Sequence, residues 1–371
     1  MTTVHELIRS ADVRDDVIEA TLADGELVAV HALAVRDSCS CSECRLPSGQ
    51  RLYETHLALR GAAPTAVHVE DTGLAVAFDD GHVVHLSLLD LERAVSGWPK
   101  RQHRLWDASL THDLSRHSFT DVAGDRAARR AWLGDVARYG VGLVVRAPLR
   151  NGTVAEVAEL FSPVRVTNYG RIFDVQVKVD MTNLADSALP LSLHTDNTYR
   201  VPQPTVQLLQ CLSSSIVGGE TILVDGFHAV EVLRRDDPDA LELLATTPIR
   251  YAYGDSTTSL ESDVPVVELG DDGAPVALRI NNRSKGIPVG PPGLVRQWYA
   301  AYFRLWDVLD QPELQSRFRL EPGEIVVFDN WRVLHGRGPF GEGGTRRLQG
   351  CYADRDALLS TLAVLERTEE R

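Results

Sequence analysis

Short runs of alternating hydrophobic and polar residues fill the first hundred positions of the chain. Residues 17–35 alternate on both sides of Asp24-Gly25, and residues 65–86 repeat the pattern around Asp80-Gly81. An Asp-Gly pair between two such runs is typical of a β-hairpin. The pattern therefore predicts a small β-rich module over 1–100.

A polar stretch over 101–117 predicts a linker, and beyond it two periods mix. Apolar side chains three to four residues apart before Gly140 predict a helix over 124–139, whereas a continuous run such as 141–145 predicts a buried strand. In full, the expected helices are 124–139, 153–161, 228–235, 238–245, 292–309 and 354–367, and the expected strands are 141–145, 171–179, 205–212, 221–225, 264–268, 276–281, 324–328 and 346–352. Many short strands with flanking helices predict an α+β domain, mostly β, over 118–371: a sandwich or open barrel with helices against one face.

Composition excludes several classes of protein. Of the 371 residues, 44% are hydrophobic and 24% are charged, as in an ordinary globular chain. The 52 acidic and 38 basic side chains give a net charge of −14, which repels phosphate backbones, so we expect no nucleic-acid partner. The sequence contains no run of 18 apolar residues, so it predicts no membrane span. The N-terminus has no targeting pattern, so we expect a cytoplasmic location.

Three of the five cysteines form a C-x-C-x₂-C cluster at Cys39, Cys41 and Cys44. In a cytosolic chain such a cluster favours metal binding or redox chemistry over disulfides. Three thiolates and one imidazole would complete a structural zinc site. His82 and His85 both follow, and residues three apart on a strand face opposite sides, so only one of them can reach the metal. The alternative is three incidental thiols.

A second cluster combines histidine and aspartate. His194-Thr195-Asp196 follows a short apolar run, but H-x-D alone is a weak signal in a chain with twelve histidines. His335, which follows the predicted strand 324–328, supplies a distal imidazole. Two imidazoles and one carboxylate form the facial triad of non-haem Fe(II), which leaves three positions for a co-substrate and O₂.

A keto acid that chelates iron also needs a partner for its far carboxylate. Arg346 and Arg347 follow His335 by 11 and 12 residues, and a guanidinium gives a carboxylate a bidentate partner. Thr221, which follows two glycines, offers a hydroxyl. A solvated pair of arginines is the alternative.

Motifs along nearly the whole chain resemble a known family. The chain is similar to the γ-butyrobetaine hydroxylase-like Fe(II)/2-oxoglutarate dioxygenases, within the taurine-dioxygenase-like superfamily. The stretches that carry the resemblance are 36–44, 80–82, 103–106, 167–170, 194–196, 218–221, 330–332, 334–337 and 346–354.

The resemblance implies a fold and a set of ligands. The expected fold is a double-stranded β-helix (jelly-roll) catalytic domain behind an N-terminal zinc-binding domain. The implied residues are Cys39, Cys41, Cys44 and His82 for zinc, with His82 preferred to His85; His194, Asp196 and His335 for iron; and Thr221 and Arg346 for 2-oxoglutarate.

The resemblance also implies an activity. Such an enzyme uses Fe(II), 2-oxoglutarate and O₂ to hydroxylate an aliphatic C–H bond, releases succinate and CO₂, and takes ascorbate as a reductant in vitro. Desaturation or cyclisation of a specialised metabolite, and a non-catalytic zinc-stabilised binding protein, are the alternatives. Relatives often dimerise, which leaves a homodimer open.

The substrate pocket departs from the family pattern. Positions that match the aromatic cage for a trimethylammonium group are Tyr169, Phe173, Asp186 and Tyr352. At its acid-binding end Asn183 matches one asparagine and the pair Asn281-Asn282 lies near another, from which we take Asn282 as the site residue. Asp186 in place of a ring would accept a hydrogen bond that a quaternary ammonium cannot donate. We therefore expect a small zwitterionic or cationic substrate, such as an amino acid, a betaine or an aminophosphonate, rather than γ-butyrobetaine itself. The alternative places Asp186 on the rim.

Overall fold

The computed structural model describes residues 8–97, 101–176, 190–339 and 344–367. The chain divides into two compact units, Met1–Arg101 and Gln102–Arg371, called unit 1 and unit 2 below.

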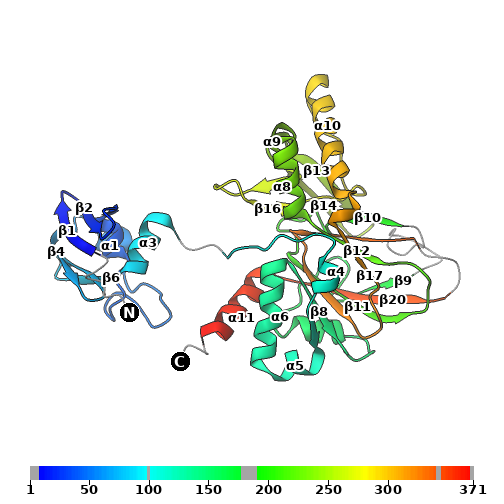
Figure 1. Ribbon diagram of the computed structural model, residues 1–371, viewed down its shortest axis with the longest axis horizontal. Coiled ribbons are helices and arrows are strands. Elements are labelled where there is room, and N and C mark those ends of the chain that lie inside the picture. Colours follow the sequence, from blue (N-terminus) through cyan, green and yellow to red (C-terminus); the bar gives the residue numbers. More distant parts are fainter. Residues whose placement is uncertain (1–7, 98–100, 177–189, 340–343, 368–371) are drawn as a thin grey trace. The chain divides into compact units, whose positions relative to one another are not determined.

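Within the described residues, unit 1 contains two three-stranded antiparallel sheets and short helices beside them (Figure 1). The two predicted hairpin turns are present, and Gly25 and Gly81 adopt positive φ angles there, a conformation that glycine adopts without strain. The alternating side chains of the strands, together with Cys39 and Cys44, form one hydrophobic core. The elements are β1 (Ile8–Arg14), β2 (Val17–Leu22), β3 (Leu27–His31), α1 (Ala32–Asp37), α2 (Thr55–Ala58), β4 (Pro64–Glu70), β5 (Gly73–Phe78), β6 (Val83–Ser87) and α3 (Leu88–Ser96).

Most of the predicted linker 101–117 belongs to unit 2. It contains α4 (Leu110–Asp113) and the start of β7 (Arg116–Ser118). Trp106 is buried, and its indole Nε1 donates a hydrogen bond to the backbone oxygen of Tyr139 at 2.6 Å. A buried indole with a satisfied N–H fixes this stretch to the core, so the polar composition of its neighbours misled the prediction.

Unit 2 is built around two sheets. One has the strand order β10-β19-β12-β17, and the other β7-β8-β18-β11-β20-β9. Their strands are β8 (Val141–Val145), β9 (Phe173–Gln176), β10 (Leu191–His194), β11 (Val206–Ser214), β12 (Thr221–Asp225), β17 (Gln315–Phe318), β18 (Ile325–Asp329), β19 (Val333–Arg337) and β20 (Arg346–Ala353).

Alternation along β18 shows how the layers form. Val326 and Phe328 point into a core that also contains Leu223 and Val333 of the other sheet, so the two sheets share this layer. Ile325 and its alternate neighbours point the opposite way, into a second core with helices α6 (Arg126–Tyr139), α7 (Thr153–Ala158) and α11 (Arg355–Arg367).

The outer face of the four-stranded sheet is covered as well. Ile222, Val224 and Leu334 pack into a third core with α8 (Gly226–Asp236), α9 (Pro238–Thr246) and α10 (Pro292–Leu309) (Figure 1). Helices therefore cover both sheets, which corrects the prediction of helices against one face. Outer faces that are apolar on both sheets require cover on both sides.

One hairpin of unit 2 was not predicted from the sequence. β13 (Ile249–Gly254) pairs with β14 (Ser259–Val264), and a smaller hairpin joins β15 (Val267–Leu269) to β16 (Pro275–Leu278). Unit 2 is completed by helix α5 (Phe119–Gly124) and the short 3-10 helix Pro312–Leu314. None of the described helices combines the length and the apolar character that a membrane span requires.

Candidate active site

Three candidate metal ligands meet in unit 2, and we call them the triad: His194, Asp196 and His335. β10 ends at His194, and β19 pairs with it so that His335 stands directly opposite. The centroids of the two imidazole rings are 4.1 Å apart, and Oδ1 of Asp196 lies 3.4 Å from Nε2 of His194. One donor atom from each residue lies within 4.8 Å of the others, a separation that one metal ion can bridge.

The protonation of the two imidazoles suits a metal ion. Nδ1 of His194 lies 2.9 Å from the backbone oxygen of Ser192, an acceptor, so Nδ1 carries the proton and Nε2 keeps its lone pair. Nδ1 of His335 is buried without a hydrogen-bond partner among the described residues. Burial lowers the pKa of His335 to about 3, so this ring is neutral at physiological pH. Neutral imidazoles and a carboxylate fit Fe(II).

The turn that carries Asp196 is held by buried amides. Oδ1 of Asn330 accepts a hydrogen bond from the Asp196 N–H at 2.8 Å, and its Nδ2 donates to the Asp196 carbonyl at 3.0 Å. Gln203 donates to the same carbonyl at 2.7 Å. Burial favours the neutral carboxyl, but the polar contacts of the carboxylate with His194 and Tyr352 outweigh it and lower the pKa of Asp196.

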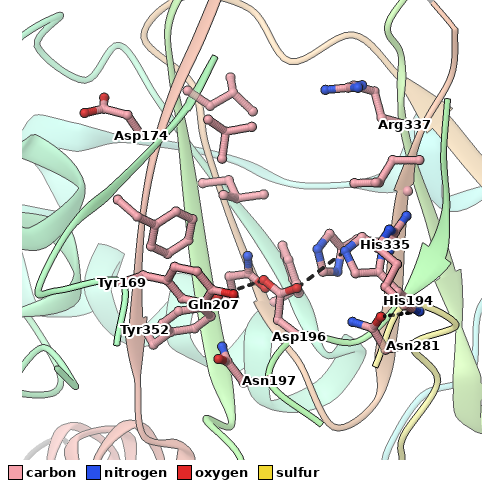
Figure 2. Close-up of a pocket in the computed structure, with 18 of the residues that line it drawn as sticks. Tyr169, Asp174, His194, Asp196, Asn197, Gln207, Asn281, His335, Arg337 and Tyr352 are labelled. Atoms are coloured by element: carbon pink, nitrogen blue, oxygen red, sulfur yellow. Dashed lines mark hydrogen bonds and ion pairs between the residues drawn. The ribbon is translucent and has the colours of Figure 1, made fainter. Parts of the chain in front are cut away.

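The triad lies in a cavity of about 700 Å³ (Figure 2). Cationic side chains from three elements line it: Arg283 after β16, Arg337 on β19 and Arg346 on β20. Burial, together with the charges of Arg346 and Arg283, lowers the pKa of Arg337 to about 10. Positive charges that converge in a partly desolvated cavity favour anionic ligands.

Arg346 and Arg347 point to opposite sides of β20, as neighbours on a strand do. Arg346 lines the cavity, where burial lowers its pKa. Arg347 instead pairs with Asp174 of β9, at 3.0 and 2.8 Å from Nε and Nη2 to the carboxylate. Thr221 also lines the cavity, across from Arg337 in the β12–β19 pairing.

Aromatic rings form one side of the cavity. Tyr169 and Phe173 have centroids 6.3 Å apart, and Phe173 stacks on Tyr352 at 5.1 Å. Tyr253 of β13 extends the series, 5.9 Å from Tyr169 and 5.1 Å from Tyr199. We call these five rings the aromatic wall. Tyr199 and Tyr253 were not anticipated from the sequence, although the alternation over 249–253 is a strand signal that would have placed Tyr253 on a hairpin.

One of the two asparagines expected at an acid-binding end of the pocket lies elsewhere. Asn281 lines the cavity and is buried, and its Nδ2 donates to the Thr195 carbonyl at 3.1 Å. Asn282 is exposed and does not line the cavity, so the expectation for Asn282 was one residue off. Asn183 and Asp186 lie outside the described residues.

Arg283 was not anticipated from the sequence. It lines the cavity and is exposed, yet its surroundings desolvate it enough to lower its pKa, against the attraction of Asp196. Its guanidinium makes no hydrogen bond or ion pair with the described residues, whereas the nearby Arg279 pairs with Glu268 at 2.8 Å. No periodicity distinguishes such a residue from a solvated loop arginine.

Unit 1 contains the second group of candidate ligands, called the cysteine cluster: Cys39, Cys41, Cys44 and His82. Their donor atoms all lie within 4.8 Å of one another. Nδ1 of His82, in the turn before β6, is 3.9 Å from Sγ of Cys41 and 3.8 Å from Sγ of Cys44. His85 points elsewhere and contacts Glu70 at 2.9 Å. Three thiols and one imidazole are a donor set that suits Zn²⁺.

A buried arginine connects the cysteine cluster to its surroundings. Nη1 of Arg36 donates to Sγ of Cys44 at 3.4 Å, and Nε donates to Asp80 at 2.7 Å. Asp80 in turn accepts a hydrogen bond from the backbone N–H of His82 at 3.2 Å. Such outer partners orient the ligands of a metal site.

Comparison with known proteins covers both units. Residues 105–352 match the Taurine catabolism dioxygenase TauD, TfdA family. Residues 10–87 match a second family, described as Gamma-butyrobetaine hydroxylase-like, N-terminal.

Named relatives align along nearly the full length. The gamma-butyrobetaine dioxygenase of Pseudomonas sp. (strain AK-1) is 32% identical, over 94% of this chain and 94% of the relative. The mitochondrial trimethyllysine dioxygenase of Gallus gallus is 31% identical, over 94% of this chain and 86% of the relative. The gamma-butyrobetaine dioxygenase of Homo sapiens is 28% identical, over 91% and 92%.

Proposed function

Because the chain belongs to the TauD, TfdA family of dioxygenases, we propose that it hydroxylates an aliphatic C–H bond of a small zwitterionic or cationic metabolite, using Fe(II), 2-oxoglutarate and O₂. The observation that carries the proposal is the pairing of His194 opposite His335, with Asp196 beside them, in a cavity that has cationic groups and an aromatic wall.

The triad would hold the iron. Its three donors leave part of an octahedral sphere free for a chelating co-substrate and O₂. When bound, the iron supplies the oxidising chemistry that couples decarboxylation of 2-oxoglutarate to removal of hydrogen from the substrate. The protein's part is to hold the donors, orient both organic ligands and exclude water from the reacting atoms.

Arg346 and Thr221 would bind the far carboxylate of 2-oxoglutarate. Arg346 suits this role because it faces the cavity and is partly desolvated, which strengthens a charge-assisted hydrogen bond. Arg347 does not, because its guanidinium is already paired with Asp174.

The substrate would lie between two kinds of surface. The aromatic wall attracts a cation through the faces of its rings. Arg283 offers a full positive charge to an anionic group and lies two residues after Asn281 on the same loop. Asn281 lies on the side of the triad away from Tyr169 and Tyr352 (Figure 2). A molecule that carries both charges matches this arrangement, as do the names of the relatives, since γ-butyrobetaine and trimethyllysine are zwitterions.

The loop that carries Arg283 is fixed to the metal site. Asn281 bonds to the Thr195 carbonyl, between the two ligands of the H-x-D motif. Ser284 bonds to Thr198 at 2.8 Å, and Lys285 lies over the rings of α10, 5.4 Å from the centroid of Trp298. An anion held by Arg283 would therefore keep a constant position relative to the iron.

Several finer features belong to the same proposal. The two sheets of unit 2 would form a double-stranded β-helix, and the cysteine cluster would bind a structural zinc ion in unit 1. A cytoplasmic location and a homodimer stay predictions from the sequence.

The test is succinate formation. The full chain, loaded with Fe(II) and supplied with 2-oxoglutarate and ascorbate, should form succinate in a one-to-one ratio with hydroxylated product for at least one zwitterion. A screen would cover cationic amino acids, betaines and aminophosphonates, with His335→Ala as the inactive control. A chain that binds no Fe(II) and forms no succinate above this control would be a non-catalytic binding protein.

A further inference from the structure

Tyr352 makes a contact that a simple wall residue does not make. It lies on β20, is buried, and its hydroxyl donates a hydrogen bond to Oδ2 of Asp196 at 2.8 Å (Figure 2). The other carboxylate oxygen, Oδ1, faces Nε2 of His194 at 3.4 Å. The two oxygens of one proposed iron ligand therefore have different partners.

We propose that Tyr352 is a positioning residue for the metal site: its hydroxyl holds Oδ2 of Asp196, so that Oδ1 alone is presented to the metal. This inference rests on the proposed function. A carboxylate that turned to bind through both oxygens would take up a second metal position, one that the co-substrate or O₂ requires. Hydrogen-bonded outer partners of this kind fix the orientation of ligating carboxylates.

The single proton of the hydroxyl is committed to this role. A phenol has one O–H donor, and Asp196 accepts it, so Tyr352 cannot also donate to a substrate. The ring meanwhile stacks on Phe173. The ring of Tyr352 is thus part of the cavity wall, and its hydroxyl orients the proposed metal ligand Asp196.

Tyr169 provides a matched control within the same wall. Its hydroxyl lies 3.0 Å from the hydroxyl of Tyr199, and the described contacts of this hydroxyl include no atom of the triad. Tyr169→Phe and Tyr352→Phe each remove one hydroxyl and keep one ring. Only the second change removes a hydrogen bond to a proposed iron ligand.

The experiment is a titration of the full-length variants with Mn²⁺, followed by the electron paramagnetic resonance signal of the free ion. Mn²⁺ prefers oxygen and nitrogen donors to thiolates, so it reports on the triad rather than on the cysteine cluster. Tyr352→Phe should weaken Mn²⁺ binding about 10- to 100-fold, the usual effect of losing an outer partner. Tyr169→Phe should bind Mn²⁺ like the wild type.

Each outcome decides the matter. If Tyr352→Phe binds Mn²⁺ like the wild type and only raises the substrate KM, the hydroxyl is part of the wall and the inference is wrong, while succinate formation by the wild type would still support the proposed function. A wild type that binds no Mn²⁺ and forms no succinate contradicts the proposed function itself. Should Tyr352→Phe not fold, Tyr352→His, which keeps a ring with an N–H donor, should bind Mn²⁺ within a few-fold of the wild type; a loss as large as in a triad variant would refute the positioning role.

Discussion

The triad and the cysteine cluster are two sets of candidate metal ligands that share almost nothing in their surroundings. The cysteine cluster has four donors, and two of its cysteines are buried in the core of unit 1. The triad has three donors, and they line a cavity with cationic and aromatic sides. A set of four closes a tetrahedral site, whereas a set of three leaves positions for ligands that come and go.

The difference teaches what each site is built to do. A closed, thiolate-rich site contributes binding energy to the fold, because unit 1 must be folded for its donors to meet. An open site keeps coordination positions free for the reactants, so it serves the reaction and contributes little to the stability of the fold. Changes in the triad should therefore abolish turnover and spare the fold, and changes in the cysteine cluster should do the reverse.

The largest effect is expected for His335→Ala. It removes a metal donor that the described residues do not replace, so succinate formation should fall by more than the ~100-fold upper range for an outer partner. The melting temperature should stay near that of the wild type, because the cavity already opens beside this ring. Turnover and thermal melting of the same preparation check both halves, and near wild-type turnover would contradict the assignment.

Arg346→Ala should raise the KM for 2-oxoglutarate next most strongly. A carboxylate that loses a desolvated charge partner loses about 2–5 kcal/mol, roughly 30- to 5,000-fold in KM. Arg347→Ala is the matched control, since its guanidinium pairs with Asp174 and does not line the cavity, and it should change KM little. If Arg347 proved critical instead, β20 would present its other side to the cavity.

Arg283→Met should act on the substrate rather than on 2-oxoglutarate. A hydrogen bond to a charged group contributes about 1.5–3 kcal/mol, so kcat/KM for an anionic substrate should fall roughly 10- to 150-fold. The uncharged amide or ester of the same substrate should be used equally by both forms. Asn282→Ala, a change at the exposed neighbour, is the control. An equal loss for charged and uncharged substrates would show that Arg283 acts only on the loop.

A functional residue can be predicted from the sequence only where its residue type and spacing form a recognisable pattern. His194, Asp196 and His335 carry donor types and spacings, and a strand register then places them face to face. Arg283 has no such pattern. It stands out because Arg279 forms an ion pair with Glu268 whereas Arg283 forms none with the described residues, and only the folded chain determines this difference. The role of Asn330 likewise depends on a contact with Asp196 across 134 residues.

Other misses have local reasons. Trp106 was assigned to a linker because its neighbours are polar, and one buried indole reverses that assignment. Asn282 was preferred to Asn281 because adjacent amides cannot be told apart without the direction of the side chain. Tyr352 was assigned to a substrate cage by its match to the family pattern, and it does line the cavity; only its hydroxyl contact with Asp196 needed coordinates.

The next prediction concerns Asp186 and the choice of substrate, and it rests on the sequence. If it lines the pocket, the enzyme should prefer a nitrogen that carries hydrogen, and Asp186→Tyr should shift selectivity toward trimethylated substrates by about 1–2 kcal/mol, the scale of one desolvated cation–π contact. The ratio of kcat/KM for matched primary-amine and trimethylammonium compounds measures the shift. An unmoved ratio would place Asp186 on the rim.

The smallest effect on turnover is expected for Cys41→Ser. It removes one thiolate from the cysteine cluster, so zinc should be lost more readily and unit 1 should melt at a lower temperature, by roughly 4–8 °C for each kcal/mol lost in a domain of this size. The KM for 2-oxoglutarate should not change, because its proposed ligands lie in unit 2. Zinc content, thermal melting and KM of the same preparation measure these effects.

His85→Ala is the control for that change, because His85 contacts Glu70 and not the thiols, and it should keep a full complement of zinc. Chelation provides an independent check. Hydrogen bonds from the Cys39 thiol and the backbone N–H of Glu43 outweigh desolvation and lower the pKa of the exposed Cys41 thiol to about 7, so the metal-free protein should be alkylated there at neutral pH. Bound zinc should protect it. Equal alkylation with and without zinc would mean that Cys41 is not a ligand. The cysteine cluster would then not be a closed site with four ligands, and its contrast with the open triad would be wrong.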